Sequence, residues 1–214
     1  MIAAILPREV VAAASRVDAP EADLFPEERA LIRTAGPKRR AEFTAARVCA
    51  RRALARLGVP AAPILTGDRR EPLWPEGVVG SLTHCAGFRA AAIGRTARFA
   101  SIGIDAEPDE PLPEGVLEHI SLPRERAQLA GGEGPNRDRL LFSAKESVYK
   151  AWFPLARRRL GFHEAAITLE VDGTFAADLL VPGPVSGFHG RWQARDNLIV
   201  TAVATPRTAR RPPV

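Results

Sequence analysis

The fold of this chain is decided by the stretch Phe142-Ser143-Ala144-Lys145-Glu146-Ser147-Val148-Tyr149-Lys150-Ala151-Trp152. Its residues are good helix formers and aromatics, and they predict a long helix from about Asn136 to Phe153, before Pro154. One stripe of that helix is apolar at i, i+3 and i+4 spacing: Leu140, Leu141, Ala144, Val148, Ala151 and Leu155. Such a stripe should face a core, which leaves ionisable residues on the other face.

The charged face of this helix has two interpretations. Only three of the 30 basic residues are lysines, and two of them, Lys145 and Lys150, flank Glu146. Because Glu146 and Lys150 are spaced i,i+4, their side chains should lie one turn apart on the same face. The simpler interpretation is an ordinary surface pair that contributes about 0.2–0.5 kcal/mol to the helix. On this segment alone, that interpretation is favoured over a catalytic one.

Length and composition restrict the class of protein. The chain has 214 residues, 46% of them hydrophobic and 26% charged, which is typical of one globular domain or two small ones. No apolar run approaches the ~18–20 residues of a membrane span, and the start lacks a basic leader before a long apolar run. Two cysteines, Cys49 and Cys85, predict reduced thiols rather than a disulfide framework. We therefore expect a cytoplasmic protein, whose net charge of +5 suits acidic partners.

The first half of the chain contains a long basic helix. Loops around a short helix at 26–33 are expected first, and then Gly36-Pro37 opens a helix that ends at Gly58. Its basic residues are Lys38, Arg39, Arg40, Arg47, Arg51, Arg52 and Arg56. A solvated charged face and a site for phosphate or an acidic protein are equally good interpretations. A loop over 59–77 and strands at 78–82, 90–94 and 99–105 follow.

The last of these strands delivers two carboxylates. Asp105 and Glu107 should point to the same side of an extended chain, a geometry that suits a hard cation such as Mg²⁺. The alternative is a solvated turn, which is the commoner use of this pattern. A short helix at 123–129 precedes the long helix, and strands at 165–171, 174–181, 190–195 and 198–204 follow it, with a tight turn at Asp196-Asn197.

The order of elements predicts an α+β protein made of two similar halves. Each half has a long helix and a small antiparallel sheet, and the halves join near Asp105. We place the N-terminal half at 1–104, the C-terminal half at 105–206, and a disordered tail at 207–214. No residue-level internal repeat is visible between the halves.

Three motifs carry a resemblance to a known family: Gly80-Ser81-Leu82-Thr83-His84, Gly103-Ile104-Asp105-Ala106-Glu107, and Ser143 to Trp152 of the long helix. In order and spacing they resemble the surfactin-type, pseudo-dimeric branch of the 4′-phosphopantetheinyl transferases. The resemblance implies two similar α+β halves with the active site between them. It also implies transfer of the phosphopantetheine arm of coenzyme A to a serine of an acyl or peptidyl carrier protein, which releases adenosine 3′,5′-bisphosphate.

The resemblance further implies roles for individual residues. Asp105, Glu107 and Glu146 match ligands of Mg²⁺, with Mn²⁺ as a substitute, and Glu146 also matches the general base. The residues that match contacts to coenzyme A are Arg39, Arg47, Thr66, Gly67, Asp68, Arg69, Thr83, His84, Lys145 and Lys150. Of these, His84 and Lys150 count with Glu146 as candidate catalytic residues. Relatives often carry Lys where this chain has Thr66, and a small residue where it has Arg70.

Two other function classes compete with this interpretation. The Arg-rich helix and tail could belong to a basic nucleic-acid-binding module, which would bind through phosphates and would not need Glu146. The carboxylates could instead serve a divalent-metal phosphohydrolase without a protein acceptor. The resemblance favours the transferase, acting on coenzyme A and an acidic carrier protein as a monomer, with no nucleic acid and no membrane as partner.

Overall fold

The computed structural model describes residues 1–129 and 134–207. Its helices and strands are, in chain order, η1 Ile2–Ile5, β1 Val11–Ser15, η2 Glu21–Asp23, α1 Pro26–Leu31, α2 Pro37–Arg56, β2 Val78–Cys85, β3 Phe88–Arg95, β4 Phe99–Pro108, α3 Val116–Ile120, α4 Pro123–Leu129, α5 Arg137–Ala156, η3 Phe162–Glu164, β5 Ala165–Leu169, β6 Thr174–Leu179, β7 Gly187–Arg195 and β8 Leu198–Pro206. The tail predicted for 207–214 lies outside the described residues from residue 208 on.

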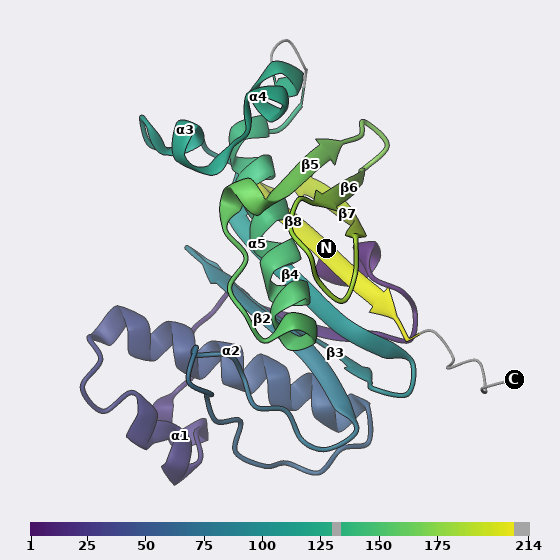
Figure 1. Cartoon of the computed structure of the whole chain (residues 1–214). Helices are drawn as coiled ribbons and strands as arrows, with labels where there is room; N and C mark the ends of the chain where they lie inside the picture. Colours follow the sequence, from purple (N-terminus) through teal and green to yellow (C-terminus); the bar gives the residue numbers. More distant parts are fainter. Residues whose placement is uncertain (130–133, 208–214) are drawn as a thin grey trace, which may run out of the picture.

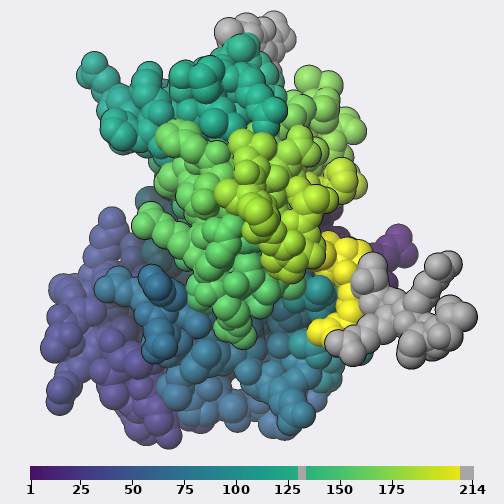
Figure 2. Space-filling view, viewed as in Figure 1, coloured from purple at the N-terminus to yellow at the C-terminus, as the bar shows by residue number. Residues whose placement is uncertain are grey.

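Two antiparallel sheets form the framework of the molecule (Figure 1). The first has the order β1-β3-β2, and the second has the order β4-β8-β7-β6-β5. Helix α2 packs on the first sheet and α5 on the second, which confirms the predicted α+β architecture of two helix-and-sheet halves. On the face shown in Figure 2, the N-terminal half occupies the lower part of the surface and the C-terminal half the upper part.

Strand alternation explains how each sheet joins two cores. In β3, Ala90 and Ala92 belong to a cluster that both sheets share, whereas Ala91 and Ile93 belong to the cluster beneath α2. In β8, Val200 and Ala202 likewise face the shared cluster, and the alternate residues face α5. Because successive side chains of a strand point to opposite faces, each sheet contributes to its own helix core and to the core between the halves.

The predicted elements are confirmed over most of the chain, but helix α3 at Val116–Ile120 was not predicted, and three further points differ. Strand β1 was missed, because the Ala-rich run Val11–Ser15 has little strand propensity and is held by its antiparallel pairing with β3. Helix α5 continues through Pro154, where a proline in the last turn costs few helix hydrogen bonds and the buried Phe153 remains packed. The predicted boundary at 104/105 falls inside β4, all of which belongs to the second sheet.

Candidate active site

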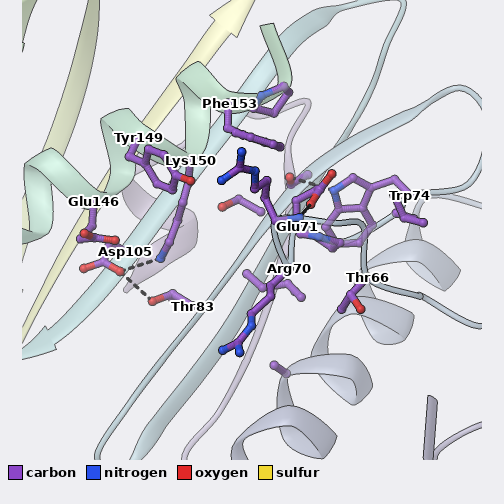
Figure 3. A pocket seen from close by; sticks show the side chains of 18 of the residues that line it. Thr66, Arg70, Glu71, Trp74, Thr83, Asp105, Glu146, Tyr149, Lys150 and Phe153 are labelled. Carbon is purple, nitrogen blue, oxygen red and sulfur yellow. Dashed lines mark hydrogen bonds and ion pairs between the residues drawn. The ribbon is translucent and has the colours of Figure 1, made fainter. Parts of the chain in front are cut away.

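A cavity of about 730 Å³ lies between the two halves. Helix α2, strand β2 and the loop that precedes β2 line it from the N-terminal half, and β4 and α5 line it from the C-terminal half. Figure 3 shows that the carboxylates of Asp105 and Glu146 occupy one end of this cavity, whereas Arg70, Glu71 and Trp74 occupy the other. One end of the wall therefore carries two carboxylates beside Lys150, and the other carries an arginine, a glutamate and an aromatic ring.

Gly103 allows α5 to reach the acidic end. A Cβ atom at this position would lie 1.9 Å from the backbone oxygen of Ser147 and 2.7 Å from the backbone nitrogen of Ala151. Only glycine fits between the strand and the helix at this distance. Asp105 and Glu107 lie on the same face of β4 as Gly103, so the close approach brings them to the charged face of α5. The sequence motif contains this glycine, but its spacing does not reveal the contact.

Asp105 lies at the centre of a hydrogen-bond network that joins the halves. Its Oδ1 accepts from Lys150 Nζ at 2.7 Å and from Thr83 Oγ1 at 3.1 Å, and Lys150 Nζ also donates to the backbone oxygen of Ile104 at 3.0 Å. The partner of Lys150 in the described chain is thus Asp105 on β4 and not Glu146 one turn away. The surface-pair interpretation of the helix is therefore wrong, because Lys150 points across to the strand.

The carboxylates differ in their surroundings. Burial raises the pKa of Glu146, the charge of Lys150 opposes this shift, and Asp105 adds to it. Burial and the charge of Asp105 raise the pKa of Glu107 to about 7, against the opposing effect of Arg139. Glu107 Oε2 lies 3.0 Å from Arg139 Nη1, a pairing that sequence reasoning missed because 32 residues separate the two.

The three predicted metal ligands are not assembled into a ready-made site. Among residues 1–129 and 134–207, no group of three or more His, Cys, Asp and Glu side chains is arranged to hold an ion by itself. Figure 3 shows the carboxylates of Asp105 and Glu146 next to each other. The third carboxylate, Glu107, is paired with Arg139 instead. Asp105 Oδ2 is buried without a hydrogen-bond partner in the described chain. A buried, unpartnered carboxylate oxygen suits a cation that shares its other ligands with a phosphate substrate.

His84 and Arg39 form a second polar group on the wall. Arg39 Nη1 lies 3.0 Å from His84 Nε2, and the other ring nitrogen of His84 lies 3.6 Å from Oε2 of Glu42. Burial lowers the pKa of His84, and Arg39 and Lys150 act in the same direction, whereas Glu42 and Asp105 oppose the shift. His84 lines the cavity together with Thr83, the residue before it in β2, whereas Cys85 is not part of the cavity wall.

Arg47 lines the cavity and also hydrogen-bonds to the backbone of Ile64. Its side chain is buried against the ring of Phe43, and its Nε donates to the backbone oxygen of Ile64 at 2.8 Å. Burial lowers the pKa of Arg47 to about 10. The predicted phosphate contact therefore shares its guanidinium with the loop that follows Ile64.

The loop after Ile64 contributes only part of the predicted set. Thr66 and Arg69 line the cavity, whereas Gly67 and Asp68, both within the described chain, lie outside its wall. A Cβ at Gly67 would lie 2.3 Å from Glu71 Oε1, but this atom ends a flexible side chain that can move away, so packing alone does not require glycine here. Arg70 lines the cavity with a φ of 66°, in the left-handed region that favours small residues.

Lys145 is not in the cavity wall, which corrects its predicted role. Its side chain is 2% exposed, and its Nζ lies 2.8 Å from Glu125 Oε1 and donates to the backbone oxygens of Phe162 and Ala165, each at 2.7 Å. Neighbouring residues on a helix differ by about 100° in direction. Lys145 therefore faces the core of the C-terminal half while Glu146 faces the cavity.

Comparison with known proteins gives the same assignment for both halves. The 4′-phosphopantetheinyl transferase N-terminal domain matches residues 27–94, and the 4′-phosphopantetheinyl transferase superfamily matches residues 101–203. The chain belongs to the 4′-phosphopantetheinyl transferase superfamily. Its mixed fold with two antiparallel sheets agrees with the pseudo-dimeric transferase fold, as the motifs implied.

Individual transferases are similar to this chain along nearly its whole length. It is 55% identical over 223 residues to 4′-phosphopantetheinyl transferase Svp of Streptomyces mobaraensis, over 98% of this chain and 91% of the relative. It is 50% identical to Npt of Nocardia iowensis and 47% identical to PptT of Mycobacterium tuberculosis, each over 95% of this chain and over 99% and 97% of the relative. Among the described residues, no helix combines the length and apolar character needed to cross a membrane.

Proposed function

We propose that this protein transfers the phosphopantetheine arm of coenzyme A to a serine of an acidic acyl or peptidyl carrier protein. Coenzyme A is the substrate that transferases of this superfamily share. The observation that carries the proposal is the cavity between the halves, where Lys150 and the Asp105–Glu146 pair lie at one end and basic side chains lie along the wall. That distribution suits a diphosphate whose reacting phosphorus lies at the carboxylate end.

The residues divide the chemistry between them. Arg39 and Arg47 bind the 3′-phosphate of coenzyme A, His84 and Thr83 contact another phosphate, and the loop at 66–70 contacts the nucleotide. Glu146 takes the proton of the serine hydroxyl as the serine oxygen forms a bond to phosphorus and the bond to the leaving phosphate breaks. Lys150 offsets the charge that develops on the departing adenosine 3′,5′-bisphosphate. The raised pKa of Glu146 makes it a better proton acceptor than an exposed carboxylate.

Asp105, Glu107 and Glu146 are the residues that would hold Mg²⁺, or Mn²⁺ in its place, beside the diphosphate. The unpartnered Oδ2 of Asp105 supports this assignment. When bound, the ion supplies charge neutralisation on the diphosphate. The protein acts as a cytoplasmic monomer that needs no nucleic acid or membrane.

The test is direct loading of a carrier. Purified protein, coenzyme A, Mg²⁺ and an apo carrier should give a carrier heavier by one phosphopantetheine arm, measured by mass spectrometry across several carrier types. Unchanged carriers throughout the panel would overturn the proposal. Release of product from coenzyme A without carrier would indicate a phosphohydrolase instead.

A further inference from the structure

Glu28 is a fully buried carboxylate outside the cavity. It is 0% exposed and joins three segments of the N-terminal half. Its Oε2 accepts from the backbone N–H of Phe25 at 3.1 Å, its Oε1 accepts from the backbone N–H of Ile64 at 2.9 Å, and Arg51 Nη1 lies 2.7 Å from Oε2. A buried charge requires such complete pairing, so the three segments are fixed relative to one another.

The C-terminal half repeats this arrangement with Glu125. Its Oε2 accepts from the backbone N–H of Leu122 at 2.6 Å, its Oε1 accepts from that of Ile167 at 2.7 Å, and its cation is Lys145 on α5. Both glutamates are the third residue of a short helix that begins with proline, in Pro26-Glu27-Glu28-Arg29-Ala30 and Pro123-Arg124-Glu125-Arg126-Ala127. A residue-level internal repeat therefore exists, contrary to the expectation from sequence.

Each glutamate and its hydrogen-bond partners form a clamp, and the two clamps fix different segments of the chain. Glu125 fixes Ile167, which lies within β5. Glu28 fixes Ile64, whose backbone oxygen is held from the other side by Arg47 at 2.8 Å. The backbone N–H and the backbone oxygen of Ile64 are thus each bound by a buried charged side chain. Thr66, two residues further on, is the first residue of this loop that lines the cavity.

The chain beyond Ile64 folds back as a small hairpin. Gly67 N donates to the backbone oxygen of Glu71 at 2.8 Å, and Leu73 N donates to that of Leu65 at 2.9 Å. The far end is held by Trp74, whose indole nitrogen donates to the backbone oxygen of Gly80 at 2.9 Å. The cavity-lining residues of the hairpin therefore lie between two fixed points, Ile64 and Trp74. Glu28 fixes the first of these through its hydrogen bond to the backbone of Ile64.

We propose that Glu28 is a positioning residue for coenzyme A binding, acting through Ile64 on the hairpin at 65–73. The inference rests on the proposed function in that it takes coenzyme A as the occupant of the cavity. The proposed role of Glu28 is confined to coenzyme A binding, because the hydrogen bonds of Glu28 reach neither Glu146 nor Lys150.

The experiment compares Glu28→Gln with Glu125→Gln, a matched buried carboxylate whose clamp does not reach the cavity hairpin. The Kd for coenzyme A is measured by calorimetry with Mg²⁺ present, well below the unfolding temperature of each variant. Glu28→Gln removes charge-assisted hydrogen bonds and should raise this Kd about tenfold, whereas its KM for the carrier stays at the wild-type value. Glu125→Gln should lose stability but keep the wild-type Kd for coenzyme A.

A second variant covers the case in which Glu28→Gln does not fold. Glu28→Asp keeps the charge beside Arg51 but is too short to hold Ile64 as well, and the same rise in Kd is expected. A wild-type Kd in the folded Glu28 variants, or an equal rise in Glu125→Gln, would overturn the inference. If wild-type protein loads no carrier while its Kd for coenzyme A depends on Glu28, the proposed function fails and the positioning role stands.

Discussion

Lys145 and Glu125 form a buried ion pair in which 2.8 Å separates Nζ from Oε1 and the two side chains are 2% and 0% exposed. The pair connects α5 to α4, and Lys145 also holds the chain that leads into β5 through two backbone oxygens. Lys145 is thus part of the interior of the C-terminal half, although it lies next to a cavity residue in sequence.

Lys145→Met should therefore destabilise the protein without weakening substrate binding. Removal of one partner of a buried pair leaves the other charge unpaired, which costs about 3–5 kcal/mol of unfolding free energy. Urea denaturation measures that loss, and calorimetry should give an unchanged Kd for coenzyme A. Lys38→Met, at an exposed position, is the control. Wild-type stability combined with weaker coenzyme A binding would restore the phosphate-contact role.

Asp105→Asn should raise the Mg²⁺ concentration required for activity. The amide keeps a hydrogen-bond acceptor for Thr83 but removes the charge that would attract the ion and that now pairs with Lys150. We expect the half-saturating Mg²⁺ concentration to rise at least about tenfold, with the fold retained by circular dichroism. Asp178→Asn, on an exposed position of β6, should behave as wild type. An unaltered Mg²⁺ requirement for Asp105→Asn would refute the ligand assignment.

Glu146→Gln should separate turnover from binding. The substitution keeps size and an acceptor oxygen but removes the basicity needed to take the serine proton. A positioned general base contributes about 10²–10⁴-fold, so kcat at saturating Mg²⁺ should fall by at least this factor. The Kd for coenzyme A should change much less, because Arg39, Arg47, His84 and Lys150 remain. Turnover within a few-fold of wild type would show that Glu146 is not the base.

Glu107 predicts opposite pH trends for stability and metal binding. Its pKa is raised from the ordinary 4.5 to about 7, chiefly by burial. As the pH falls, the Glu107 carboxylate is therefore protonated at a higher pH in the folded chain than in the unfolded chain. Its contribution to the unfolding free energy of the metal-free protein is therefore fully present below about pH 4.5 and is lost as the pH rises through about 7. Mg²⁺ needs the ionised carboxylate, so its affinity should fall below about pH 7.

Urea unfolding and Mg²⁺ titration across this pH window measure both trends, with Glu107→Gln as the comparison. The Gln variant should lose this component of the pH dependence in both measurements. Identical pH profiles for Glu107→Gln and wild type would contradict the shifted pKa.

Carrier binding should depend on ionic strength. The protein has a net charge of +5, and an acidic carrier would be steered toward it electrostatically. The KM for the carrier should rise with salt, whereas an uncharged osmolyte at equal osmolality should leave it unchanged. A KM that stays flat from low to high salt would exclude steering.

The sequence by itself determined most of the elements and the identity of the cavity motifs. Apolar periodicity located α5 and its core stripe, turn residues located the hairpin at Asp196-Asn197, and the three motifs indicated the family. These features depend on local spacing, which a chain carries without reference to its fold. Alanine-rich β1 escaped detection because its conformation comes from pairing with β3.

The tertiary structure alone decided which charged side chains meet. Sequence spacing pairs Lys150 with Glu146. In the structure, Gly103 has no side chain, so α5 approaches β4 closely and Lys150 forms its ion pair with Asp105. Lys145 is next to the cavity residues in sequence, yet its side chain points to the other side of the helix and forms an ion pair with Glu125. The equivalence of Glu28 and Glu125 was likewise missed, because the shared pattern Pro-x-Glu-Arg-Ala is short and the bonds to Ile64 and Ile167 span more than 20 positions. Such contacts depend on how closely two elements approach and which way each side chain points, and both are set only when the core closes.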